Sequence, residues 1–194
     1  SEKIDLAIDN FLFVVNNYQK TKYFKEALSG LQSAYASIGN IQKYLEVVKS
    51  LPEFSITEAE QDSLMYNTAF MKFSELDYMI ARSAFDSYLE RFPKGVFVDD
   101  ANYYNAISAL NLKDTASAVN LYKKLVASTS LSYHEVALKF LARKAYASKD
   151  FIESNRYYEK LLACASSNSI KREALIRLMI LNECSDMRVA VTYA

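Results

Sequence analysis

Small and aromatic residues recur three and four positions apart along most of the chain, with polar residues between them. In the stretch ARSAFDSYLERFPKG, which covers residues 81–95, Ala81, Phe85 and Tyr88 share one face of a helix. Such spacing is typical of an amphipathic α-helix. Pro93 disfavours helical continuation, because proline restricts the residue before it. The stretch therefore predicts a helix near residues 78–92.

The same face recurs at nearly constant intervals, which indicates an internal repeat. Its first members follow one another at separations of 37, 37, 37, 36 and 36 residues: Ala7, Tyr44, Ala81, Ala118, Ser154 and Ala190. Four residues before all but the first stand Asn40, Asp77, Asp114, Asp150 and Asp186. Side chains of Asn and Asp accept hydrogen bonds from the free amides of a helix start. These residues are therefore predicted N-caps, each between a longer helix A and a shorter helix B.

An all-α chain of eleven helices is expected, near residues 3–18, 22–38, 41–51, 56–75, 78–92, 96–112, 115–127, 132–148, 151–164, 167–183 and 186–193. They form one repeat array: a lone helix B within 1–20, units near 22–51, 56–92, 96–127 and 132–164, and a partial unit at 167–194. Two helix starts have capping-box spacing, Thr57 with Glu60 and Ser132 with Glu135. Small residues at the same phase of helix A predict close helix packing: Ala69, Ala106 and Ala142.

Composition narrows the possible functions. The chain has 23 basic and 23 acidic side chains in 194 residues, so its formal net charge is zero. A general nucleic-acid binder needs a basic excess, and we expect no nucleic-acid partner. No apolar run approaches the roughly 20 residues that span a bilayer, so direct membrane insertion is not expected. Cys164 and Cys184 are predicted free thiols, because the helix ends that carry them point in opposite directions.

Catalytic chemistry is not indicated by any motif. His134 is the only histidine, it lies at a predicted helix start, and no glycine-rich phosphate loop is present. The acidic pair Glu60 and Asp62 is expected on a solvated helix start, where it would interact favourably with the helix dipole. The sequence therefore predicts a protein that is not an enzyme and needs no cofactor or metal.

On these residues the chain resembles the tetratricopeptide repeat family. The resemblance consists of the small residues of helix A, the small residues of helix B, the aromatic residue four positions later, and Pro93. It implies a right-handed superhelix of stacked antiparallel helix pairs. The longer repeat and the segment RFPKGVFVDDANYYNA resemble envelope-associated members from Gram-negative bacteria. That similarity implies the periplasm or cell envelope, with the cytoplasm as the alternative.

The family resemblance also implies a function. Its members hold peptides or partner proteins, often on the concave surface lined by helix A. The matching positions here form a groove that changes from aromatic to basic: Tyr66, Phe70, Phe73, Tyr103, Ile107, Leu110, Lys139, Arg143 and Tyr146. An acidic or C-terminal segment is expected near Lys139 and Arg143. Two alternatives stay open: these residues pack against neighbouring helices, or the chain is a structural spacer with no groove ligand.

Apolar residues crowd both ends of the array, at Phe11 to Val15 and at Met187 to Val191. Repeat arrays usually end in polar caps, because a repeat buries its apolar face only against its neighbours. The chain is therefore expected to be a segment of a longer repeat protein, or to have its end faces covered by another subunit. Self-association through the terminal apolar faces follows from the same argument.

Overall fold

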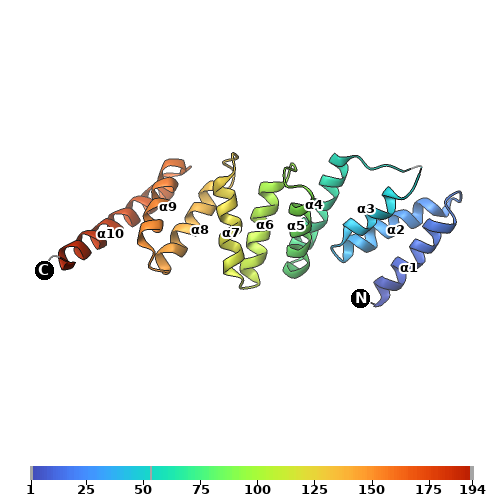
Figure 1. Cartoon of the computed structure of the whole chain (residues 1–194), viewed down its shortest axis with the longest axis horizontal. Helices are drawn as coiled ribbons and strands as arrows, with labels where there is room; N and C mark the ends of the chain where they lie inside the picture. The colour runs from blue at the N-terminus through green and yellow to red at the C-terminus, as the bar shows by residue number, and fades with distance from the viewer. Residues whose placement is uncertain (1, 53, 193–194) are drawn as a thin grey trace. The chain divides into compact units, whose positions relative to one another are not determined.

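The computed structural model describes residues 2–52 and 54–192, with side chains described as far as residue 183 (Figure 1). These residues form ten α-helices and no strand: α1 (Glu2–Asn17), α2 (Tyr23–Ser37), α3 (Ile41–Lys49), α4 (Glu58–Ser74), α5 (Tyr78–Arg91), α6 (Val98–Asn111), α7 (Thr115–Ala127), α8 (His134–Ala147), α9 (Phe151–Cys164) and α10 (Asn168–Thr192). The all-α prediction is confirmed. The right-handed superhelix stays a prediction.

The end of the chain differs from the sequence prediction. The last two predicted helices, 167–183 and 186–193, are one continuous helix, α10. The predicted N-cap at Asp186 is therefore wrong, since the backbone is helical on both sides of it. No Gly or Pro occurs after Gly95, so nothing in this segment strongly opposes helix continuation. The side chains of Asp186, Ala190 and Cys184 lie outside the described part, whereas Cys164 is a free thiol.

A left-handed residue precedes four of the predicted caps. Gly39, Leu76, Lys113 and Lys149 have φ between 61° and 71°, and their positions repeat the 37- and 36-residue intervals of the caps that follow them. In three of these turns the next amide donates to a carbonyl five residues earlier, as in Asp77 N to Lys72 O at 3.0 Å. This geometry is the Schellman motif, which ends a helix and satisfies its last carbonyls. The repeat is thus visible in the backbone as well as in the sequence.

The capping predictions have different outcomes. Asp77, Asp114 and Asp150 each accept a hydrogen bond from the third residue of the next helix, as predicted. Asn40 occupies the N-cap of α3 without a side-chain bond. The capping box of Thr57 and Glu60 is also present, with both reciprocal bonds.

The second predicted capping box, Ser132 with Glu135, is wrong. Helix α8 begins at His134, and Tyr133 occupies the N-cap without a side-chain bond. The Glu135 carboxylate instead accepts hydrogen bonds from the amide and hydroxyl of Ser166, at 2.7 and 2.8 Å. Glu135 therefore joins the start of α8 to the loop after α9, a contact between residues 31 positions apart.

The chain divides into two compact units, residues 1–113 and 114–194. Within each unit, consecutive helices pack against one another, and in the first unit α4 also contacts α6. The small positions predicted for close packing are fully buried: Ala69, Ala81, Ala106, Ala118, Ala142 and Ser154. In the second unit the Ser154 hydroxyl donates to the Ala142 carbonyl at 3.0 Å, so these two positions meet across α8 and α9. In α1 the buried residues are Ile8 and Val15, whereas the predicted repeat position Ala7 is half-buried.

A buried carboxylate on α4 holds the loop between α5 and α6 through hydrogen bonds. Asp62 is 6% exposed, so its predicted place on a solvated helix start is wrong. It accepts a hydrogen bond from the Tyr88 hydroxyl at 2.6 Å and another from the Val96 amide at 2.9 Å. The Tyr88 oxygen in turn accepts from the Phe97 amide at 3.0 Å. A Cβ on Gly95 would lie 2.5 Å from that oxygen, so the glycine of the FPKG turn is needed for this close approach.

Candidate functional site

The first three predicted groove residues lie in the aromatic core of residues 1–113. Tyr66 is 9% exposed, and its ring stacks on Phe97 with centroids 4.4 Å apart. Phe70 and Phe73 are half-buried, and each ring centroid lies 4.9 Å from that of Tyr104 on α6. These three residues therefore pack against neighbouring helices, which is one of the two alternatives that the sequence left open. They hold α4 against α5 and α6.

The next three predicted residues share one face of α6. Tyr103, Ile107 and Leu110 are all half-buried, and their i, i+4, i+7 spacing places them in one stripe. The Tyr103 ring lies 5.2 Å from that of Tyr104. This stripe belongs to the first compact unit, whereas the last three predicted residues belong to the second.

Lys139 and Arg143 of α8 converge on one carboxylate. The Lys139 ammonium lies 2.7 Å from Glu173 Oε2, and the Arg143 guanidinium donates to Glu173 Oε1. Tyr146, the third predicted residue of this helix, lies under Arg177, whose guanidinium carbon is 5.6 Å from the ring centroid. Glu173 and Arg177 both come from α10. We call these five residues the α8–α10 basic patch.

The charged side chains of the basic patch act on one another. The Lys139 ammonium and the Arg143 guanidinium hold the pKa of the Glu173 carboxyl below its ordinary value of 4.5. Two cationic side chains contact this carboxylate and Arg177 lies over the Tyr146 ring, so the five residues carry three positive charges and one negative charge. A pocket of about 410 Å³ next to it is lined by the apolar or aromatic Tyr122, Val136, Phe140 and Ala147 and by the cationic Lys139, Arg143 and Lys144.

The pH dependence of stability should report the Glu173 contacts. A carboxyl with a lowered folded pKa stabilises the fold above its unfolded value of 4.5 and loses that contribution as the pH falls through the folded value. We expect the wild-type protein to be about 1 kcal/mol more stable than Glu173→Gln at neutral pH, with the difference shrinking as the pH falls below 4.5 and through the lowered folded pKa. Thermal melts across this range measure it. Glu183→Gln on the same helix is the control, and an equal loss in the control would contradict the assignment.

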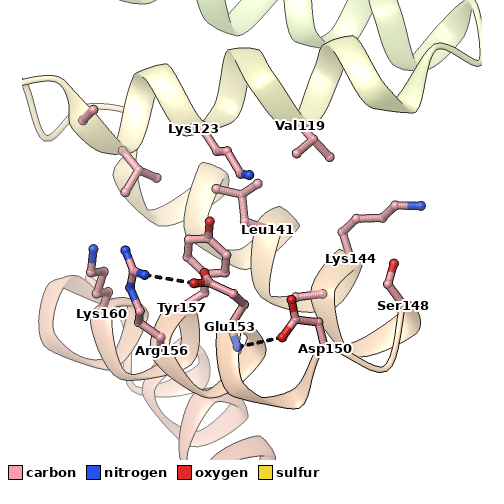
Figure 2. Close-up of a pocket in the computed structure, with 13 residues that line it drawn as sticks. Val119, Lys123, Leu141, Lys144, Ser148, Asp150, Glu153, Arg156, Tyr157 and Lys160 are labelled. Carbon is pink, nitrogen blue, oxygen red and sulfur yellow. Dashed lines mark hydrogen bonds and ion pairs between the residues drawn. The ribbon is translucent and has the colours of Figure 1, made fainter.

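A second concave site lies in the same unit, between α7, α8 and α9 (Figure 2). Its volume is about 660 Å³. Apolar side chains from all three helices line it: Val119, Val126, Ala127, Leu141, Ala145 and Tyr157. Leu141 and Tyr157 are buried and supply its floor. We call this the α7–α9 cleft.

Charged side chains border the α7–α9 cleft. Figure 2 shows Lys144 toward one end, Lys160 toward the other, and Lys123 between them. The two acids at this rim are already engaged: Asp150 caps α9, and Glu153 pairs with Arg156 at 2.9 Å. No ion pair of the described residues involves any of the three lysines. The cleft thus combines an apolar floor with a cationic rim.

Charge is distributed unequally between the two units. Residues 114–194 carry 12 basic and 8 acidic side chains, a net charge of +4, and residues 1–113 carry 11 basic and 15 acidic side chains, a net charge of −4. The zero net charge of the whole chain hides this difference. Both concave sites therefore lie in the unit that has a positive net charge.

Sequence reasoning found Lys139, Arg143 and Tyr146 but missed their partners. Glu173 lies 34 residues from Lys139 and 30 from Arg143, beyond the range of helical spacing rules. The α7–α9 cleft was missed for a related reason, since its lining comes from three helices. The positive net charge of residues 114–194 was the one available signal.

Two features are absent from the part of the chain that the structure describes, a membrane-spanning helix and a metal site. None of the described helices is long and apolar enough to cross a bilayer, as the sequence predicted. No group of three His, Cys, Asp or Glu side chains in this part of the chain is arranged to hold a metal ion.

No protein-family model and no curated protein matches this chain. Function is therefore inferred from its residues and their geometry.

Proposed function

We propose that the chain is a non-enzymatic scaffold that binds a segment of a partner protein through a carboxylate at the α8–α10 basic patch. One observation carries this proposal: Lys139 and Arg143 already hold the carboxylate of Glu173 from two directions. A partner carboxylate, from an acidic side chain or a C-terminus, finds the same donors. The resemblance to the tetratricopeptide repeat family also supports a protein-binding role, because members of that family hold peptides or partner proteins.

Glu173 sets the strength of this site. A partner carboxylate either replaces Glu173 or binds beside it with the help of Arg177, whose guanidinium lies over the Tyr146 ring. Replacement costs the existing ion pairs, so affinity is limited by the competition. An apolar residue next to the bound carboxylate would enter the pocket of Tyr122, Val136 and Phe140. The preferred ligand is thus an acidic segment with adjacent apolar side chains.

Two variants with opposite expected effects test this function. The probe is a fluorescein-labelled peptide of alternating Leu and Glu with a free C-terminal carboxylate, measured by fluorescence anisotropy. Lys139→Gln with Arg143→Gln should weaken binding about tenfold, because two partly exposed charged contacts are lost. Glu173→Gln should strengthen it, because the internal competitor is removed. Added salt should weaken wild-type binding.

Controls separate this result from nonspecific charge effects. Lys124→Gln with Lys149→Gln removes two exposed lysines of the same unit that line neither concave site. This pair should bind the probe as the wild type does, and a peptide with Lys in place of Glu should not bind. Equal affinity of the wild type, the patch variant and Glu173→Gln would contradict the proposal and favour a structural spacer.

A further inference from the structure

We propose that the α7–α9 cleft is a second docking surface, which receives an acidic amphipathic helix of a partner protein. The cleft contains none of the five residues of the basic patch, although Lys144 lines both the cleft and the pocket beside the patch. Its proposed ligand is a folded helix, whereas the patch needs only a carboxylate. The test therefore substitutes Lys123 and Lys160, which line the cleft and not that pocket.

The floor of the cleft fits an apolar helix face. Val119 and Val126 are seven residues apart on α7, so they lie on the same side of that helix. Helices α7 and α9 form the two walls of the cleft. Leu141 and Ala145 are four residues apart on α8, the helix that lines the cleft between these walls. Tyr157 of α9 completes the surface (Figure 2). Burial of such a stripe against a ligand's leucines is the main source of affinity in helix-in-groove binding.

The rim determines the charge of the ligand. Lys123 lies on one wall, Lys160 on the other, and Lys144 near the end of α8. All three are exposed. The rim acids are occupied, Asp150 by the α9 amide of Glu153 and Glu153 by Arg156. Carboxylates on both flanks of a bound helix would meet these lysines, while a basic ligand would find no uncommitted acid at the rim. Rim charges of this kind contribute specificity and association rate.

The walls favour a helix over an extended strand. An extended peptide gains affinity from main-chain hydrogen bonds to an exposed sheet edge. The cleft offers helices α7, α8 and α9, whose interior amides and carbonyls are already paired within the helices. An extended backbone would therefore be desolvated without compensation. A helical ligand satisfies its own backbone and presents side chains only.

The experiment uses the full chain and a designed peptide helix. The peptide carries Leu at i, i+3, i+4 and i+7 and Glu on both flanks. Its binding is measured by anisotropy and its location by NMR shift changes. Lys123→Glu with Lys160→Glu should weaken binding about tenfold or more, because two attractive rim charges become repulsive. Lys124→Glu with Lys171→Glu changes the charge equally, away from the cleft lining, and should bind as the wild type does.

Further variants keep the proposal falsifiable. Val119→Asn tests the apolar lining of the cleft and should also weaken binding, with circular dichroism confirming a folded chain. Lys139→Gln with Arg143→Gln should leave the NMR shift changes at the cleft residues unchanged, even where the peptide also binds the basic patch, which separates the two sites. Equal binding by the two charge-reversed pairs, or by a peptide with Lys for Glu, would overturn the proposal. So would self-association of the wild type that Lys123→Glu with Lys160→Glu abolishes, because a second copy would then occupy the cleft.

Discussion

Replacing Asp62 with alanine should destabilise residues 1–113 by about 3–5 kcal/mol. The carboxylate is buried and accepts from the Tyr88 hydroxyl and the Val96 amide. Its removal leaves a buried hydroxyl and a loop amide without their acceptor, and hydrogen bonds to charged groups are worth about 1.5–3 kcal/mol each. A loss of this size is a large part of the stability of a typical domain.

Hydrogen exchange followed residue by residue gives the clearest measurement for this variant. Amides of α4, α5 and α6 should lose protection, while those of α8 and α9 should keep it, because the two units are separately compact. Tyr88→Phe should release a different loop amide, because Phe97 loses its acceptor while Val96 keeps Asp62. Glu58→Ala, an exposed residue on the same helix, is the control. Equal protection in Asp62→Ala and Glu58→Ala would show that the carboxylate does not hold the loop.

Helix positions were predictable because they depend on local signals. The caps at Asp77, Asp114 and Asp150 each act within three residues, so their side-chain bonds follow from the sequence. The left-handed residues before them were not predicted. Leu76, Lys113 and Lys149 carry no glycine-like signal, and their φ values come from the hairpin between helix A and helix B.

The predicted groove shows the limit of periodicity. Tyr66 and Lys139 occupy equivalent phases of their helix A, 73 residues apart, yet one ring is buried and the other side chain meets a carboxylate from α10. A period reports which face of a helix a residue occupies. It does not report what covers that face, since the covering residues come from other helices. Contacts such as Lys139 with Glu173 and Tyr66 with Phe97 therefore needed the structure.

Tyr66→Ala is expected to destabilise residues 1–113 by about 3–5 kcal/mol, the usual cost of deleting a buried aromatic side chain. The Tyr66 ring contacts four others, those of Phe70, Phe85, Tyr88 and Phe97. Its loss therefore opens a cavity where α4, α5 and the start of α6 meet. Burial raises the pKa of its hydroxyl strongly, so that group stays neutral at physiological pH.

Tyr66→Phe separates the ring from the hydroxyl. The phenylalanine variant keeps all four ring contacts and should lose less than about 1 kcal/mol, because the Tyr66 hydroxyl forms no hydrogen bond with the residues that the structure describes. Tyr103→Ala provides a second comparison, since its ring is half-buried on α6. Urea denaturation followed by circular dichroism measures all three variants. If Tyr66→Ala unfolds no more readily than Tyr103→Ala, the ring is not a core residue, and its predicted place in a ligand groove becomes the better interpretation.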